Sequence, residues 1–457
     1  MIKRSNSILK TAEYFFAREP LRTIKGLCSA YIAYPVAEKL EKRNVTNKLD
    51  AIQNYYKKPF EDREKIIKGK LYEIVSFSKR HVPYYKDILN SIAFDPEKLR
   101  QDVRYLQDIP LLTKDIIREQ NERLFSQPLN EVRHHICKTG GSTGLSCFIY
   151  YDQEAADYSS AVTLLSRDSV GNKKYKPELH FACRFLGEEQ PDWPNREDFK
   201  CFAMNRSNIF FSSLDNEGLE EILSTLEIRR PYMIHAHPST IYALACYVEK
   251  NYGSLTLFKI FESSGELLEE YMRSKIEKAL NCKVINRYGL AELGVMAYQF
   301  HGSRDMFVYD SEGYPENIDH DNSKSELVFT GFRNKLMPLI RYGTGDIATV
   351  DKRNDGFFLT NVTGRIHDVV KLNGKEFPTH HIQDVLDHRV GGIQEFQIDT
   401  RKENPILRLV LELNAAPQEI SAKIEYYWPN AFIVQFVNHE DFIRVGHRSK
   451  FRHVVDK

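Results

Sequence analysis

A segment with almost no protruding side chains is the strongest local constraint on this chain. From Lys138 to Asp152 the sequence reads "KTGGSTGLSCFIYYD", and residues 139–144 are three glycines, two threonines and a serine. An apolar, aromatic run typical of a strand follows directly. Backbone N–H groups and small hydroxyls in such a segment can surround an anion, so one interpretation is a phosphate-binding loop. The alternative is a plain tight turn before a strand, and no Gly-Lys-Ser/Thr ending indicates a Walker A loop.

The chain is large enough for two or more folding units and carries almost no net charge. Its 457 residues are 42% hydrophobic and 28% charged, an ordinary globular balance. The net charge of +1 provides no overall field that would recruit nucleic acid or an anionic membrane. The seven cysteines form no CxxC pair, which favours free thiols in a reducing, cytoplasmic compartment. A Cys/His zinc site has no ligand spacing to support it.

The first 65 residues are basic and have helical spacing, so we expect a helical N-terminal extension over 1–65. Its longest apolar patch, Leu27 to Ala37, is too short to span a bilayer and lacks a signal-peptide cleavage pattern. We interpret this patch as an amphipathic helix packed on the body. Contact with a membrane surface is the minor alternative.

The pattern of apolar residues changes twice along the chain after the N-terminal helices. Residues 70–89 follow helical spacing until Pro83 interrupts it, and Thr113 has the position of a helix N-cap. Residues 130–300 alternate short apolar runs with helical patterns, which is typical of α/β layering. From residue 324 the elements are short strands, and Asp355-Gly356 predicts a hairpin. Residues 364–457 have the pattern of a small α+β unit.

Three later segments strengthen the interpretation of a nucleotide site. "NRYGLAELG" (286–294) sets an aromatic ring, a glycine and a carboxylate within five residues. "PLIRYGTGDIA" (338–348) places Asp346 after a glycine-spaced turn, where a carboxylate could accept both hydroxyls of a ribose. "TGRIHDVVKLNGKEF" (363–377) carries Arg365 just after a turn. Each segment alone is typical of a solvated turn, but four in this order indicate one site.

As a set, these segments resemble the motifs of the adenylate-forming superfamily of acyl-CoA synthetases. Within it the chain is most similar to the branch of phenylacetate–CoA ligases and of CapK-like proteins of capsular polysaccharide biosynthesis. "TGGSTG" resembles the phosphate loop, "YGLAE" the Tyr-Gly-x-Thr/Ser-Glu motif, "RYGTGD" the Arg/Tyr-x-Thr-Gly-Asp motif and "GRIHDVVKLNG" the hinge. The ending "HRSKFRHVV" resembles the tail that carries a mobile catalytic lysine, here Lys450. The resemblance extends from about residue 70 to the end.

The resemblance implies a fold and a reaction. The fold is α/β, with a large multi-sheet N-terminal body over 66–363 and a small, mobile α+β C-terminal lid over 364–457. In the reaction a carboxylate joins the α-phosphate of ATP, releases pyrophosphate and leaves an acyl-adenylate. Because two anions must meet, cations and N–H donors aimed at the developing charge supply most of the help. The residues expected to be catalytic are Lys450, Arg365 and Glu292, with Glu292 holding Mg²⁺.

The resemblance also implies a set of binding residues. Tyr288 is expected against adenine, Asp346 at the ribose, and Arg365 near the ribose or phosphate. The full nucleotide-binding set is Thr139, Gly140, Gly141, Ser142, Thr143, Gly144, Ser264, Gly265, Glu266, Arg287, Tyr288, Gly289, Asp346 and Arg365. The expected contacts to the acid are His235, His237, Pro238 and Tyr151. A hydrogen-bonded core role is the alternative for both histidines, and a buried-strand role for Tyr151.

The chain departs from the family pattern at a few positions. Ala291 replaces the usual Thr or Ser, which removes one hydroxyl near the α-phosphate or Mg²⁺. His367 stands where an Asp is common, and Ser449 replaces the glycine before the lysine. Leu145 and Ser146 follow the loop where Lys or Pro is frequent. None of these changes removes a principal charge, so we expect activity to be retained.

The expected function is activation of a small carboxylic acid, followed by transfer of the acyl group to coenzyme A. One alternative passes the acyl group to an amine, a sugar hydroxyl or a protein thiol on a carrier. The other is a nucleotide-binding protein without catalysis. No nucleic-acid partner and no transmembrane segment are expected, and the sequence leaves a homodimer open.

Overall fold

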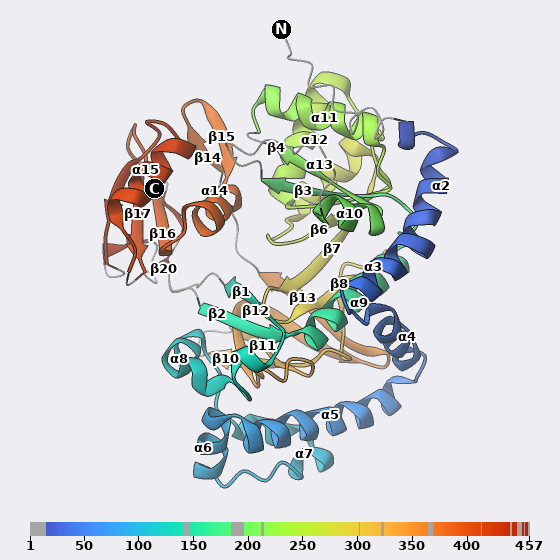
Figure 1. Cartoon of the computed structure of the whole chain (residues 1–457), viewed down its shortest axis with the longest axis vertical. Helices are drawn as coiled ribbons and strands as arrows, with labels where there is room; N and C mark the ends of the chain where they lie inside the picture. The colour runs from blue at the N-terminus through green and yellow to red at the C-terminus, as the bar shows by residue number, and fades with distance from the viewer. Residues whose placement is uncertain are drawn as a thin grey trace.

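The computed structural model describes most of the chain and shows a large body with a smaller unit beside it (Figure 1). The described residues are 15–139, 147–183, 196–211, 214–300, 302–320, 324–363, 369–412, 414–438, 441–445, 450–451 and 453–455. No helix among them is both long and apolar enough to cross a membrane.

Five parallel strands form one half of an 11-stranded sheet, in the order β7-β6-β5-β3-β4. They are β3 (Glu178–Cys183), β4 (Arg206–Phe211), β5 (Met233–Ala236), β6 (Ile260–Ser263) and β7 (Lys283–Leu290). The helices between them bury apolar faces against this half; they are α11 (Asn216–Arg229), α12 (Pro238–Tyr252) and α13 (Glu270–Leu280). The α/β layering predicted for 130–300 is confirmed. Parallel neighbouring strands need crossover connections, and the helices that alternate with the strands supply them.

The other half of the same sheet is antiparallel and continues in the order β8-β9-β13-β12-β11-β10. Its strands are β8 (Gly294–Gln299), β9 (Met306–Val308), β10 (Gly313–His320), β11 (Lys324–Gly331), β12 (Tyr342–Arg353) and β13 (Gly356–Thr363). Arg353 pairs with Gly356 across the turn, which confirms the hairpin predicted at Asp355-Gly356. The strand β7 belongs to both halves, since it pairs in parallel with β6 and antiparallel with β8.

A separate hairpin carries the glycine-rich segment. Strands β1 (His134–Thr139) and β2 (Cys147–Asp152) pair antiparallel, and the register ends with Thr139 opposite Cys147. Residues 140–146 therefore connect these two strands. Helix α9 (Gln153–Ser169) follows at once, with the carboxylate of Asp152 accepting the backbone N–H of Ala155 at 2.7 Å.

Within the described residues the N-terminal part is helical, while the extension expected over 1–65 stays a prediction. It consists of α2 (Leu21–Cys28), the π-helix η1 (Ser29–Ala33), α3 (Tyr34–Leu40), α4 (Val45–Tyr56), α5 (Phe60–His81) and α6 (Pro83–Ser91). The helical pattern breaks at Pro83, as expected for a residue without an N–H, and residue 65 lies inside α5. Shorter elements follow: α7 (Lys98–Gln101), η2 (Val103–Asp108), α8 (Lys114–Gln120), η3 (Asn121–Leu124) and η4 (Leu129–Glu131). The hydroxyl of Thr113 caps α8, accepting the N–H of Ile116 at 3.3 Å.

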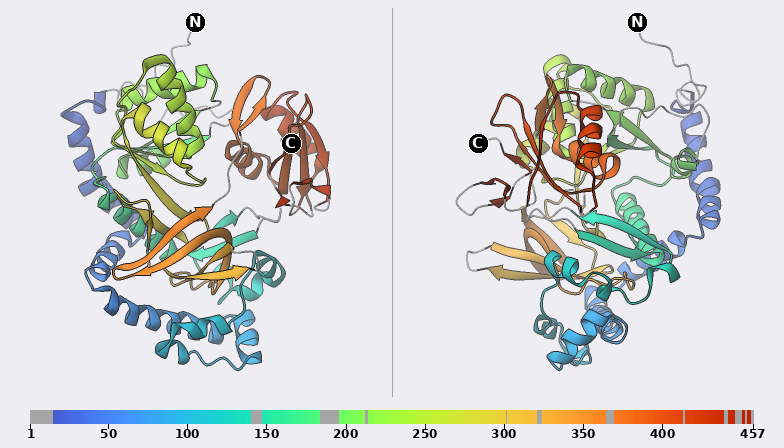
Figure 2. Two further views of the ribbon diagram at one scale, coloured as in Figure 1. Left: turned by 180° about the vertical axis from the view of Figure 1, so that it is seen from behind. Right: turned by 60° about the vertical axis from the view of Figure 1, so that its left-hand side comes forward.

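The C-terminal unit has its own sheet and core (Figure 2). Its four-stranded sheet has the order β18-β17-β16-β21, flanked by two short hairpins, β14-β15 and β19-β20. The elements are β14 (Val369–Leu372), β15 (Lys375–Pro378), α14 (Thr379–Val385), η5 (Leu386–Val390), β16 (Ile393–Asp399), β17 (Ile406–Leu411), α15 (Pro417–Tyr427), β18 (Ile433–Phe436), β19 (Arg444–Val445), β20 (Lys450–Phe451) and β21 (Val454–Val455). The predicted fold class, a large α/β body with a small α+β C-terminal part, is confirmed.

Candidate active site

The carboxyl ends of β5 and β6 bring two of the predicted segments together. His237 and Pro238 begin α12 after β5, and Ser264, Gly265 and Glu266 follow β6. The carboxylate of Glu266 accepts the N–H and the hydroxyl of Ser239 at 3.1 and 3.0 Å. Gly265 has φ +85, and a methyl group there would lie 2.4 Å from His237 Cε1. Only glycine allows this close approach of the two turns.

The next strand adds a buried cation beside the same turn. Arg287 in β7 donates from its guanidinium to the hydroxyl of Ser264 at 2.8 Å. Burial lowers the pKa of Arg287 below its usual value, and the opposing attraction of the Glu262 carboxylate is the smaller effect. A guanidinium held by a serine hydroxyl retains donors for an anionic or polar ligand.

Tyr288 joins β7 to a segment more than fifty residues further along the chain. Its hydroxyl donates to Asp346 Oδ2 at 2.7 Å, and Asp346 lies in β12. Burial, and then the Asp346 carboxylate, raise the pKa of Tyr288 well above its usual value. The phenol therefore stays protonated and keeps its hydrogen bond. The ring and the carboxylate expected at adenine and ribose thus contact one another directly.

Glu292 forms a second such pair with β12. It lies in the turn between β7 and β8, only 7% exposed, and Tyr342 donates its hydroxyl to Glu292 Oε1 at 2.6 Å. The Cys137 thiol of β1 donates to the carbonyl oxygen of Ala291 at 3.4 Å. Burial, and then Glu292, raise the pKa of Cys137 to about 12, so this thiol is neutral. The β1-β2 hairpin, which carries the glycine-rich segment, is therefore held against the Glu292 turn.

Several predicted residues lie outside the described part of the structure. These are Gly140, Gly141, Ser142, Thr143, Gly144 and Arg365, together with the departures Leu145, Ser146, His367 and Ser449. Thr139 and Lys450 are described only through their backbones, at the end of β1 and in β20. Gly289 lies in β7, where it pairs with Val295.

His235 belongs to a buried polar network behind the site. Its Nδ1 lies 2.8 Å from Glu262 Oε2, and Glu262 is completely buried. Arg167 of α9 contacts both Glu262 and Glu178, at 2.8 and 2.6 Å. Tyr298 also donates to Glu262, at 2.8 Å. This arrangement is the core role that the sequence left open for His235.

A chamber of about 890 Å³ opens at the Glu292 turn. Residues of α3, β2, α9 and α10 (Arg196–Ala203) form its walls, and Glu292 is part of its lining. Tyr151 also lines it, stacked on His135 with 5.4 Å between ring centroids. The lining is mixed, with Arg43 paired to Asp157 at 2.7 Å and apolar side chains between. A chamber of this size and character suits a small organic ligand.

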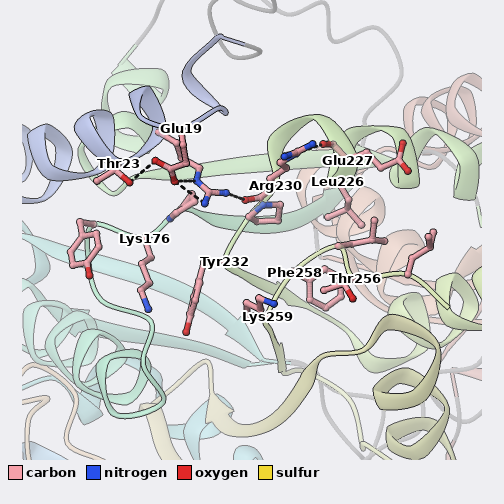
Figure 3. Close-up of a pocket in the computed structure, with 16 residues that line it drawn as sticks. Glu19, Thr23, Lys176, Leu226, Glu227, Arg230, Tyr232, Thr256, Phe258 and Lys259 are labelled. Atoms are coloured by element: carbon pink, nitrogen blue, oxygen red, sulfur yellow. Dashed lines mark hydrogen bonds and ion pairs between the residues drawn. The ribbon is translucent and has the colours of Figure 1, made fainter.

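A second cavity, of about 780 Å³, lies at the opposite end of the parallel strands (Figure 3). It is lined by residues that precede β5 and β6, such as Tyr232 and Lys259, and by part of α2. None of the predicted site residues whose side chains the structure describes lines it. Because open α/β sheets bind ligands at the carboxyl ends of their strands, we assign the active site to the first location.

The donor set at Glu292 fits a magnesium ion shared with phosphates. No group of three His, Cys, Asp or Glu side chains gathers as a metal site within the described ranges. Mg²⁺ in nucleotide sites uses one or two carboxylates together with phosphate oxygens and water, so a single buried carboxylate is a suitable ligand. Glu292 meets this requirement.

Two residues of the site, and the part of α3 that lines the chamber, were not predicted from the sequence. Tyr342 lies inside the "RYGTGD" segment, but nothing in the spacing indicated that it holds Glu292. Cys137 gave no signal beyond lying next to the loop. The residues of α3 that line the chamber come from a part of the chain outside the family resemblance.

No family model matches the chain, but individual proteins do. It is similar to the protein CapK of Staphylococcus aureus, 24% identical over 376 residues, which cover 78% of this chain and 80% of that protein. It is similar to the phenylacetate–coenzyme A ligase of Thermus thermophilus, 22% identical over 382 residues, covering 76% and 80%. It also resembles the indoleacetate–lysine synthetase of Pseudomonas savastanoi, 22% identical over 327 residues, covering 69% and 79%.

Solved structures share the fold. A 2-hydroxyisobutyryl-CoA ligase in the postadenylation state, in complex with R3-HIB-AMP, superposes with a TM-score of 0.54 at 19% identity, covering 87% of this chain and 90% of that one. The same ligase in the thioesterification state, with 2-HIB-AMP and CoA, gives a TM-score of 0.53 at 18% identity, with the same coverage of 87% and 90%. These likenesses bear out the architecture expected from the motifs.

Proposed function

We propose that this chain, a member of the adenylate-forming superfamily in its phenylacetate–CoA ligase and CapK branch, activates a carboxylic acid with ATP. A carboxylate oxygen of the acid attacks the α-phosphorus, the bond to the bridging oxygen breaks, and pyrophosphate leaves. The acyl-adenylate then transfers its acyl group to the thiol of coenzyme A, releasing AMP. The relatives named as CoA ligases and the structural neighbours with acyl-AMP and CoA support this reaction.

One observation carries the proposal. Two segments far apart in the sequence meet twice through short tyrosine–carboxylate hydrogen bonds, Tyr288 with Asp346 and Tyr342 with Glu292. Both carboxylates are thereby held at one corner of the sheet, next to the hairpin that carries the glycine-rich segment. One carboxylate can accept the hydroxyls of a ribose and the other can hold the metal of a triphosphate, so the pair suits ATP.

The remaining roles are assigned by the resemblance and by charge. We assign Thr139, Gly140, Gly141, Ser142, Thr143 and Gly144 to the β- and γ-phosphates. Tyr288 and the turn Ser264–Glu266 would face adenine, with Arg287 and Gly289 beside them, and Arg365 would add a charge-assisted contact. Lys450 would steady the transition state as a point charge. Mg²⁺, held by Glu292, would neutralise charge on the phosphates.

We assign the acid to the chamber beside Glu292. The carboxylate of an acid bound there would lie near Glu292 and the expected nucleotide site. The volume of about 890 Å³ is larger than a very small acid would fill. Tyr151 offers an aromatic surface and a hydroxyl to such a substrate. His237 and Pro238 remain predicted contacts on the side of the β5–α12 turn. His235 would affect the positions of His237 and Pro238 only indirectly, through the packing of its strand.

A second acyl acceptor is favoured by one specific observation. The relative named indoleacetate–lysine synthetase matches 69% of this chain at an identity similar to that of the CoA ligases. Transfer of the adenylated acid to an amine is therefore the second candidate, with a sugar hydroxyl or a protein thiol as further acceptors of the same chemistry. We place the reaction in the cytoplasm, consistent with six cysteines of the described residues that form no disulfide.

The decisive experiment measures pyrophosphate release by the purified full chain with Mg²⁺·ATP across a panel of aliphatic, aromatic and hydroxy acids. We expect release with a subset of the acids, and acyl-CoA formation once coenzyme A is added. Acyl-adenylate that persists with coenzyme A but is consumed by an amine or a sugar would select the second candidate. ATP binding without pyrophosphate release for any acid would leave only a non-catalytic nucleotide-binding protein.

A further inference from the structure

The N-terminal helix turns its large apolar residues away from the protein. From Leu21 to Leu40, helices α2, η1 and α3 follow one another without a break in helical backbone. Ile24, Tyr31 and Ile32 are 52%, 69% and 63% exposed. The whole exposed row is Leu21, Ile24, Leu27, Tyr31, Ile32, Val36 and Leu40, which recur at helical spacing. Figure 1 shows these helices along the outer edge of the molecule.

The inner side of the same helix consists of small residues. Gly26, Ser29, Ala30 and Ala33 are buried against the body. A methyl group at Gly26 would lie 2.0 Å from the carbonyl oxygen of Tyr175, so the backbones approach too closely for any larger residue. The orientation of the helix is therefore determined by packing, and the large side chains have no place on the inner side.

Polar contacts hold α2 in this orientation. Arg22 pairs with Glu19 at 2.9 Å and donates to the carbonyl oxygen of Arg230, at the end of α11, at 3.1 Å. Thr23 donates its hydroxyl to Glu19 at 2.7 Å. These contacts lie on the side of the helix that faces the body, so the exposed row is a fixed feature of the surface.

Helix α10 extends the exposed row. It packs against η1 and α3, and its Phe199 and Phe202 are exposed. We call the row of α2–α3 together with these two phenylalanines the outer apolar face. Monomeric proteins rarely expose a contiguous apolar surface of this length without a partner that covers it.

The charge of the N-terminal segment indicates which kind of partner covers the outer apolar face. Residues 1–43 contain nine lysines and arginines but only four glutamates and no aspartate. Helix α10 adds the exposed Glu197 and Asp198 beside Phe199, so the excess of positive charge lies on the α2–α3 segment. Two copies of the chain meeting through this face would bring two basic segments together, which is unfavourable at a self-complementary interface. An anionic lipid surface attracts the same segment, at about 1 kcal/mol for each basic residue near the surface.

We infer that the outer apolar face lies in the interface of an anionic lipid bilayer, with the helix parallel to the membrane plane. An amphipathic helix with leucine, isoleucine and aromatic residues on one face and basic residues around them has the composition of such interfacial helices. Tyr31 and the two phenylalanines suit the boundary between head groups and acyl chains.

The mouth of the chamber lies at one end of the outer apolar face. Leu40 and Phe199 belong to the outer apolar face and also line the chamber that reaches Glu292. A chain docked in this way would hold the mouth of the chamber beside the lipid surface. An acid or an acyl acceptor embedded in the membrane could then enter without crossing water.

The test is sedimentation of the full chain with vesicles of 3:1 phosphatidylcholine and phosphatidylglycerol. We expect binding that weakens with salt and with vesicles of phosphatidylcholine alone. Ile24→Glu and Ile32→Glu should each reduce partitioning by about tenfold or more, because a charge replaces a buried apolar side chain. The matched control is Tyr426→Glu, at an equally exposed aromatic residue of α15, which should bind like the parent.

Two readouts keep the result unambiguous. The variants should keep the parent's thermal midpoint and its pyrophosphate release without vesicles, since neither isoleucine lines the chamber. Failure of the parent chain to sediment, or equal loss in Tyr426→Glu, would overturn the inference. So would a concentration-dependent dimer that Ile24→Glu dissociates while vesicles are not bound, because the outer apolar face would then be covered by a second copy.

Discussion

The carboxylate of Asp346 is the residue on which nucleotide binding should depend most directly. Tyr288 already holds it in place through a 2.7 Å hydrogen bond. We predict that Asp346→Ala weakens ATP binding by about tenfold or more, since each hydrogen bond to a charged acceptor contributes about 1.5–3 kcal/mol. Calorimetric titration with ATP measures this, and Asp351→Ala, an exposed carboxylate on the same strand, is the control. Equal affinity of the parent for ATP and 2′,3′-dideoxy-ATP would count against the ribose contact.

Glu292 should act through charge rather than through shape. Glu292→Gln keeps the volume and can still accept from Tyr342, but it loses the negative charge that a metal needs. We predict a fall in acid-dependent pyrophosphate release by a few orders of magnitude, because a catalytic metal contributes several kcal/mol. The fold should persist, as judged by the thermal midpoint. Glu217→Gln, at an exposed position of α11, should leave the rate unchanged. Normal turnover of Glu292→Gln with Mg²⁺·ATP would remove this assignment.

At the scale of elements, the network around Glu262 ties one helix to four strands. Arg167 of α9 links Glu178 of β3 to Glu262 of β6. His235 of β5 and Tyr298 of β8 also contact Glu262. We predict that Glu262→Gln lowers the free energy of unfolding by about 3–5 kcal/mol, because Arg167 would keep a buried charge with one partner fewer. Urea denaturation measures the loss. Glu249→Gln, which breaks an exposed pair with Lys275, should cost about 1 kcal/mol or less.

The same network should make stability depend on pH. His180 of β3 also belongs to it, with its ring 5.0 Å from that of His235 and its Nε2 3.4 Å from Glu178 Oε2. Burial lowers the pKa of His180 and of His235, with Arg167 adding to the effect at both. Unfolded histidine titrates near about 6.5, so below that pH the unfolded chain binds protons that the folded chain does not. The free energy of unfolding should then fall, by up to about 1.4 kcal/mol for each histidine and pH unit. Melting curves from pH 7.5 to 5.5 test this, and His235→Asn should flatten the profile. A parent profile that is already flat would contradict it.

At the scale of the whole molecule, the C-terminal unit has a core of its own, and we propose that it moves as a lid. Domain closure is a common way to complete a site and exclude water. Lys450, in β20, would reach the α-phosphate only in the closed form. We predict that Lys450→Ala nearly abolishes formation of acyl-AMP from ATP and acid, while ATP binding and transfer from supplied acyl-AMP remain.

The control for this prediction is Lys402→Ala, an exposed lysine of the same unit. It should run both half-reactions at the parent rate. If Lys450→Ala also runs both at the parent rate, the lysine is part of a solvated tail. Equal loss of both half-reactions would indicate a folding defect or a unit that does not move.

The sequence by itself determined the local features of this protein. Thr113 caps a helix, Pro83 interrupts one, and Asp355-Gly356 turns a hairpin because each depends on a few neighbouring backbone groups. The motif order was sufficient to indicate the superfamily and the fold class. The residues 140–146 and 364–368 lie outside the described structure, so the roles expected of the loop and of Arg365 stay predictions.

Only the tertiary structure decided which of these features meet and which face is buried. Spacing could not show that Tyr342 holds Glu292, since the two lie in separate segments and only the sheet order joins them. It also could not show that residues of α3 line the chamber. We expected the Leu27–Ala37 patch to form an amphipathic helix on the body, and it does pack there, but through its small residues. Periodicity distinguishes the two faces of a helix. Which one is buried depends on how closely the opposing surface approaches, and here the contact at Gly26 leaves room only for the small side.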